Sequence, residues 1–147
     1  MPVSKFPFLQ PSSDSLGAML HYRVEKLIGE GGMGYVFKGS DTRLQRPVAL
    51  KVLKPEIAIR THGHERFMRE ARAMAAIQHP NVVTIFHVDR QGEFPFFAME
   101  LLEGETLADR LTREKTLPLD VTLRLTRQML LGLQAAHQTN LIHRDIK

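Results

Sequence analysis

Apolar residues follow two different periods along this chain. Where apolar and polar residues alternate, or branched residues gather between turn-forming residues, the pattern predicts strands. Where apolar residues return every three or four positions, it predicts helices. Five strands are predicted, at residues 22–28, 34–38, 47–53, 82–88 and 94–101. Three helices are predicted, at residues 65–78, at residues 106–113 and from residue 117 to about residue 139.

The helix boundaries have local signals. Apolar residues from Phe67 to Ile77 recur on one face of the first helix, and the His-Pro-Asn at 79–81 supplies its stop. Thr106 is the expected N-cap of the second helix, because its hydroxyl can accept a hydrogen bond from a free N–H group of the first turn. Strands with one inserted helix, followed by helices, indicate an α+β fold of two unlike parts.

Three segments follow from this order. Residues 1–20 contain three prolines and a Ser-Ser-Asp-Ser cluster, and their apolar residues follow no period, so we expect a flexible N-terminal arm. Residues 21–103 carry the predicted strands, and residues 104–147 carry the last two helices.

Composition excludes several classes of protein. The chain has 147 residues, of which 43% are hydrophobic and 24% charged, and this balance is typical of one domain with a buried core. It has no cysteine, which fits a cytoplasmic location, and no apolar run approaches the roughly 18 residues of a membrane span. The 20 basic residues exceed the 16 acidic ones, but the two signs are interleaved, so we expect no nucleic-acid partner.

The segment from Gly29 to Gly34 fits the pattern G-x-G-x-x-G. Glycines let backbone N–H groups approach phosphate oxygens closely. A dinucleotide-binding fingerprint would need a helix directly afterwards, whereas residues 35–39 favour a strand. The segment is therefore interpreted as a hairpin folded over a ligand, with a glycine-rich turn that binds nothing as the alternative.

Two charges stand in apolar surroundings. Lys51 lies in a predicted strand whose alternation puts Ala49 on the same face as the ammonium group. Glu70 falls on the apolar stripe of the first predicted helix, and a buried carboxylate needs a partner. Lys51 and Glu70 would satisfy each other as an ion pair. The alternatives are a lysine that reaches water from an edge strand and a boundary glutamate that pairs with Arg66 or Arg69 on its own helix.

A last motif, His-Arg-Asp-Ile-Lys, occupies residues 143–147, and its order after the other motifs makes chance an unsatisfactory explanation. Together the motifs resemble the first half of a protein kinase domain, in particular the eukaryotic-type serine/threonine kinases of bacteria. The resemblance runs from Tyr22 to Lys147. It implies a five-stranded antiparallel N-lobe sheet with one C-helix at 21–103, which binds ATP, and a truncated helical C-lobe at 104–147 that ends in the catalytic loop.

The resemblance also implies roles for individual residues. The glycines would cover the ATP phosphates, Lys51 would bind the α- and β-phosphates, and Glu70 would hold Lys51. Asp145 would accept the proton of the substrate hydroxyl, and Lys147 would steady the γ-phosphate. The cofactor-binding residues implied by the family are Ile28, Gly29, Gly31, Gly34, Val36, Ala49, Lys51, Met99, Glu100 and Leu102.

The family's metal-binding asparagine and Asp-Phe-Gly aspartate would lie beyond Lys147, so no metal ligand is expected among these residues, and His62 and His64 are interpreted as solvated. The expected function is transfer of the ATP γ-phosphate, with Mg²⁺, to serine or threonine hydroxyls of proteins, with negligible activity for these residues alone. The alternative is a non-catalytic fragment that binds nucleotide or regulates a relative. A dimer through the N-lobe is left open.

Overall fold

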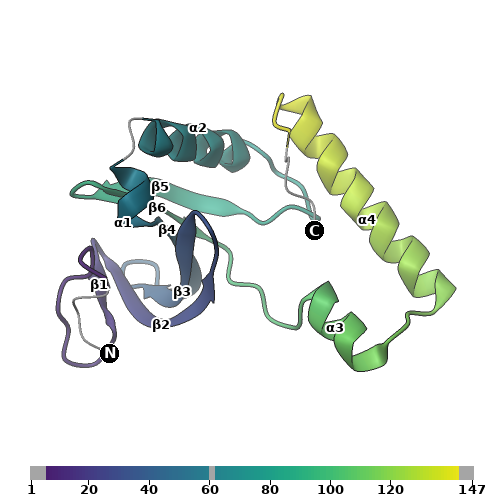
Figure 1. Ribbon diagram of the computed structural model, residues 1–147, viewed down its shortest axis with the longest axis horizontal. Helices are drawn as coiled ribbons and strands as arrows, with labels where there is room; N and C mark the ends of the chain where they lie inside the picture. Colours follow the sequence, from purple (N-terminus) through teal and green to yellow (C-terminus); the bar gives the residue numbers. More distant parts are fainter. Residues whose placement is uncertain (1–5, 60–61, 143–147) are drawn as a thin grey trace.

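One antiparallel sheet organises the computed structural model, which describes residues 6–59 and 62–142 (Figure 1). Within these residues the sheet has six strands in the order β1-β2-β3-β4-β6-β5. The strands are β1 Gly17–Met19, β2 Tyr22–Glu30, β3 Gly34–Asp41, β4 Arg46–Leu53, β5 Ile85–Gln91 and β6 Phe94–Met99. The α+β class is confirmed, as are the five predicted strands, whose ends shift by up to three residues. β1 is additional.

Strand alternation gives the sheet two unlike faces. On one face, Phe37, Val48, Leu50, Val52 and Phe96 have no solvent exposure and form the main core. Burying such a side chain contributes roughly 1.5–3 kcal/mol. The odd-numbered residues of β4 and β6 point to the other face, where Leu53 and Phe97 join a second core.

The second core is closed by the segment between β4 and β5. This segment contains α1 (Pro55–Ala58) and α2 (Gly63–Ala75), and α2 lies along β5 and β6 (Figure 1). Phe67 and Ala71 are the buried residues of α2, and the ring centroid of Phe67 lies 5.4 Å from that of Phe97. The predicted helix at 65–78 is thus confirmed, with a start two residues earlier and an end three residues earlier.

The expectation of a flexible arm at 1–20 is wrong for the described residues 6–20. Phe6, Phe8 and Leu9 are buried in the main core, and the ring centroid of Phe6 lies 5.1 Å from that of Phe37. A backbone bridge joins Gln10 to Ala18 in β1. A segment that crosses a sheet face needs only a few apolar anchors, not a period, so the pattern did not reveal this packing.

Two helices follow β6. They are α3 (Leu107–Glu114) and α4 (Leu119–Gln138), which stand beside the sheet in Figure 1. The predicted N-cap is confirmed, because the Thr106 hydroxyl accepts a hydrogen bond from the Asp109 N–H group at 3.0 Å. A Cβ atom at Gly132 of α4 would come within 2.8 Å of the Asn81 carbonyl oxygen, so glycine permits this close approach. Among the described residues, no helix is long and apolar enough to cross a membrane.

The packing of the N-terminal segment predicts a measurable loss of stability. Phe6→Ala should lower the free energy of unfolding by about 3–5 kcal/mol, because the truncation leaves a cavity beside the rings of Phe8, Tyr35 and Phe37. Urea denaturation followed by circular dichroism measures the change. Leu44→Ala is the control, since Leu44 is 64% exposed and should change stability by less than about 0.5 kcal/mol. Equal free energies of unfolding for the two variants would contradict the packing of the N-terminal segment against the main core.

Candidate active site

The second face of the sheet brings predicted site residues together. Directly paired residues of antiparallel strands point to the same side of a sheet. Val36 in β3 pairs with Lys51 in β4, and Ala49 pairs with Met99 in β6. Gly29 in β2 pairs with Val36. These five residues form what we call the Lys51 face, and the small side chain of Ala49 lies on the same side of β4 as the ammonium group, as the alternation predicted.

Lys51 itself is half-buried. Its Nζ atom lies 5.8 Å from the ring centroid of Phe97, which is its cross-strand partner in β6. No carboxylate of the described residues lies within 4 Å of it. The ammonium group therefore lies near an aromatic ring, and among the described residues it has no carboxylate partner that would compete with an anionic ligand.

The glycine segment forms the hairpin between β2 and β3, as predicted. We call residues 29–34 the glycine hairpin. The Gly31 N–H group donates a hydrogen bond to the Gly34 carbonyl oxygen at 2.9 Å. A Cβ atom at Gly34 would lie 2.5 Å from the Val52 carbonyl oxygen, so this position requires glycine. Gly31 and Gly32 have open space where side chains would be, and their backbone is therefore accessible.

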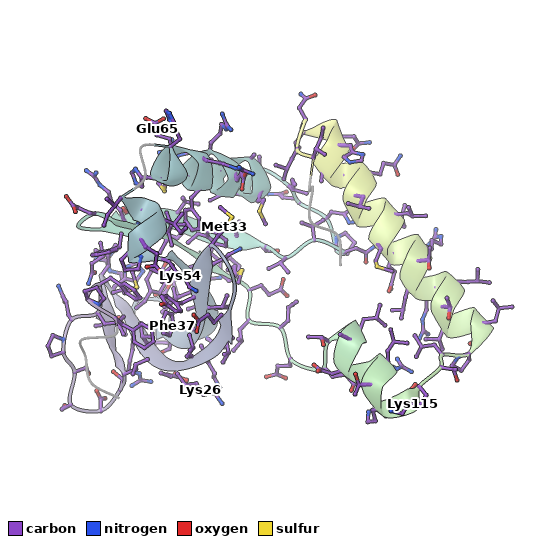
Figure 2. All side chains as sticks on the ribbon, viewed as in Figure 1. Lys26, Met33, Phe37, Lys54, Glu65 and Lys115 are labelled. Carbon is purple, nitrogen blue, oxygen red and sulfur yellow. The ribbon has the colours of Figure 1, made fainter. Side chains whose placement is uncertain are left out.

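An ion pair that the sequence analysis missed fixes the base of the glycine hairpin. Lys54 Nζ lies 2.8 Å from Glu30 Oε1, and the Lys54 N–H group donates to the Met33 carbonyl oxygen at 3.0 Å. Lys54 and Met33 are labelled in Figure 2. The hydrogen bond to Glu30 raises the pKa of the Lys54 amine above its ordinary value. Both contacts tie the hairpin to the segment just after β4. The signal available in the sequence was a second lysine directly after the strand of Lys51.

Glu70 does not pair with Lys51, and this prediction is wrong for the described structure. Glu70 Oε1 instead accepts a hydrogen bond from Arg66 Nε at 2.9 Å, which is the alternative of a boundary glutamate paired on its own helix. Its side chain is 42% exposed. The physical reason is its position on α2, at the edge of the stripe centred on Phe67 and Ala71, where an i, i+4 partner is always within reach.

Other predicted site residues lie at the margins of the Lys51 face. Ile28 falls in an irregularity of the β2–β3 pairing and is 46% exposed. Glu100 and Leu102 belong to the connection after β6, where the Glu100 N–H group donates to the Thr84 carbonyl oxygen at 2.9 Å. Asp145 and Lys147 lie outside the described residues. No group of three His, Asp or Glu suited to a metal ion occurs within residues 6–59 and 62–142.

Comparisons with known proteins agree with this arrangement. The protein kinase domain family matches residues 22–147. Serine/threonine-protein kinase PknL of Mycobacterium tuberculosis (strain CDC 1551 / Oshkosh) is 40% identical over 126 residues, which are 86% of this chain and 32% of the relative. Serine/threonine-protein kinase pkn2 of Myxococcus xanthus is 41% identical over 134 residues, which are 91% of this chain and 16% of the relative.

The fold has solved counterparts. The crystal structure of the Mycobacterium tuberculosis PknI kinase domain superposes with a TM-score of 0.80 at 24% identity, and the match covers 93% of this chain and 56% of that domain. The curled antiparallel sheet, with its glycine hairpin and its strand lysine, thus matches the N-terminal part of a kinase domain. The chain belongs to the protein kinase family, and its curated relatives are bacterial serine/threonine kinases. It spans about a third or less of the length of those relatives.

The exposed position of Glu70 predicts a small effect on stability. Glu70→Gln should change the free energy of unfolding by less than about 0.5 kcal/mol, because exposed i, i+4 pairs contribute only a few tenths. A buried pair with Lys51 would instead cost about 3–5 kcal/mol when broken. Chemical denaturation distinguishes the two values. Arg66→Gln is the matched control, and it should behave like Glu70→Gln, whereas a large loss confined to Glu70→Gln would contradict the described pairing.

Proposed function

We propose that this chain forms the ATP-binding part of a serine/threonine protein kinase. The observation that carries the proposal is the pairing of Val36 with Lys51 and of Ala49 with Met99 next to the glycine hairpin. This register gathers one positive charge, two small or branched apolar side chains and an accessible backbone on one face. The positive charge and the accessible backbone would meet the triphosphate, and the apolar side chains would meet the adenine.

Each part of the Lys51 face has a role in this proposal. Gly29, Gly31 and Gly34 cover the phosphates, and Lys51 binds the α- and β-phosphates. Ile28, Val36 and Ala49 enclose the adenine. Met99 lies at the back of the pocket, and the backbone from Glu100 to Leu102 hydrogen-bonds the adenine edge. The open space at Gly31 and Gly32 supports this reading, because those backbone groups have no side chain in the way of a phosphate.

We also propose that α2 has two conformations, which differ in the partner of Glu70. In active kinases the strand lysine and the helix glutamate form an ion pair. The partner that Glu70 has in this structure is Arg66, and an exposed pair of that kind stabilises by only about 0.3–0.5 kcal/mol. Replacing Arg66 by Lys51 as the partner of Glu70 would therefore cost little free energy once phosphates hold Lys51 in place. We propose that nucleotide binding favours this exchange.

The transfer step would use residues 143–147. The Asp145 carboxylate accepts the proton of a serine or threonine hydroxyl as that oxygen attacks the γ-phosphorus. An oxygen–phosphorus bond forms, the bond between the γ-phosphorus and the bridging oxygen breaks, and ADP leaves. Lys147 holds the transferred phosphoryl group. Mg²⁺ neutralises phosphate charge in this family, through an asparagine and an Asp-Phe-Gly aspartate that the present sequence does not include.

A second candidate function is a non-catalytic one, in which the chain binds nucleotide or regulates a relative. The observation that favours it is that Lys51 has no carboxylate partner among residues 6–59 and 62–142, because an active kinase needs the lysine–glutamate pair. In both proposals the partners are ATP and other proteins. They differ in whether phosphoryl transfer occurs.

Nucleotide binding tests the proposal common to both candidates. Isothermal titration with ATP should show binding to the 147-residue chain, and Lys51→Met should weaken it about tenfold or more, because a charge-assisted hydrogen bond to phosphate is lost. Lys26→Met is the matched control, since Lys26 is exposed on β2 and should leave binding unchanged. Absence of ATP binding, or equal losses in the two variants, would refute the Lys51 face as a nucleotide site.

A transfer assay tests whether these 147 residues transfer a phosphoryl group by themselves. The 147 residues alone, incubated with radiolabelled ATP, Mg²⁺ and a serine/threonine-rich protein substrate, should incorporate no label, because two metal-holding side chains of the family are missing. Asp145→Asn is the control for contaminating kinases. Label incorporated by the wild type and abolished in Asp145→Asn would contradict this expectation.

A further inference from the structure

One buried aromatic ring, that of Tyr35, lies at the base of the glycine hairpin. Tyr35 directly follows the last glycine of the hairpin and is 7% exposed. Its partners in the sheet are Glu30 in β2 and Val52 in β4. Residues 31–33 of the hairpin are exposed, whereas the base is joined to the sheet. The order of the hairpin therefore depends on how firmly the residues at its base are held.

Lys54 connects the Tyr35 ring to the glycine hairpin. Its Nζ atom lies 5.1 Å from the centroid of that ring, a distance at which an aromatic ring attracts a cation. The same ammonium group pairs with Glu30, and the Lys54 backbone N–H group donates to Met33. In Figure 2, Lys54 is labelled between Phe37 of the main core and Met33 of the hairpin. A shift of the Tyr35 ring would therefore change the surroundings of the lysine that holds the hairpin.

The N-terminal segment, which we define as residues 6–20, contacts the same ring. The ring centroid of Phe6 lies 5.2 Å from that of Tyr35, and the two ring planes are nearly perpendicular, at 82°. The ring centroid of Phe8 lies 6.3 Å from that of Tyr35. Aromatic pairs at such distances stabilise beyond the area that they bury. Tyr35 is therefore a contact both of the N-terminal segment and of Lys54.

A side-chain amide of β5 anchors the N-terminal segment near both of its ends. Gln91 Oε1 accepts a hydrogen bond from the Leu20 N–H group at 2.7 Å, and Gln91 Nε2 donates to the Phe8 carbonyl oxygen at 2.8 Å. Within the segment, Gln10 and Ala18 exchange two backbone hydrogen bonds of 2.9 Å. The segment is thus a closed loop bound to the sheet, and this loop carries the rings that contact Tyr35.

We infer that the N-terminal segment positions the glycine hairpin, with Phe6 and Phe8 acting through Tyr35 and Lys54. The rings of the segment restrict the Tyr35 ring, this ring restricts the Lys54 ammonium group, and the ammonium group holds Glu30. A hairpin that is already ordered has less conformational freedom to lose when a ligand binds, so docking of the segment favours nucleotide binding. This consequence for the nucleotide rests on the proposed function, whereas the effect on the hairpin does not.

Hydrogen–deuterium exchange of residues 29–34, in the 147-residue chain without nucleotide, tests the effect on the hairpin. Tyr35→Leu should speed the exchange of these amides severalfold, because leucine keeps apolar volume but offers no ring to Lys54 or Phe6. Tyr35→Phe keeps the ring and should exchange like the wild type. Val24→Ala is the matched control, since Val24 is buried in the same core but lies near the start of β2, whereas the hairpin follows the end of that strand.

Isothermal titration with ATP tests the consequence for the nucleotide. Phe6→Leu and Tyr35→Leu should each weaken ATP binding about threefold to tenfold, because binding must then order the hairpin, whereas Val24→Ala should leave it unchanged. In a Lys54→Met background, Phe6→Leu should cause little further loss, because the residue through which Phe6 acts is already gone. In a Lys51→Met background, Phe6→Leu should keep its full effect. A general loss of stability would not produce this difference between the two lysine backgrounds.

Three results would overturn the inference. These are unchanged exchange of the hairpin in Tyr35→Leu, equal changes of exchange in Tyr35→Leu and Val24→Ala, and independent losses of ATP affinity for Phe6→Leu and Lys54→Met. Failure of the proposed function would look different, because the wild-type chain would then bind no ATP. In that case the exchange rates of residues 29–34 alone would confirm or refute the link between the N-terminal segment and the hairpin.

Discussion

The structure depends on the alternation of β4, which holds the main core on one side and a charge on the other. Val48, Leu50 and Val52 have no solvent exposure, and Lys51 lies between them on the opposite face. A slip of one residue would place the ammonium group in the core and three apolar side chains outside it. Burial of the apolar face therefore fixes the register with β3 and β6, and the register in turn sets Val36, Ala49 and Met99 around Lys51.

The ion pairs of this chain are of two kinds. Some join residues close together on one helix, and others join residues that are far apart in the sequence. Two pairs on helices, Arg66 with Glu70 and Arg110 with Glu114, join residues four apart. They form whenever the helix forms, and each contributes little. The pair between Lys54 and Glu30 is different, because it joins two strand ends and holds the glycine hairpin against the sheet. A longer-range pair of this kind depends on the sheet being assembled first.

Much of the fold could be predicted because the strands and α2 carry clear periods. Phe67 and Ala71 were expected to be buried on α2, and they are. The N-terminal segment could not be predicted in this way. Phe6 and Phe8 belong to no periodic element, and their burial depends on the rings of Tyr35 and Phe37, which lie far along the chain.

The features of the candidate site also divide into those that the sequence predicted and those that it did not. The sequence by itself determined the glycine hairpin, the face of Lys51 and the N-cap at Thr106, because turns, strand alternation and caps are properties of neighbouring residues. Only the tertiary structure decided that Glu70 turns to Arg66, that Lys54 holds Glu30, and that Tyr35 meets both Phe6 and Lys54. Long side chains at the edge of a helix can reach several partners, and only the assembled sheet and helices determine which of them are near.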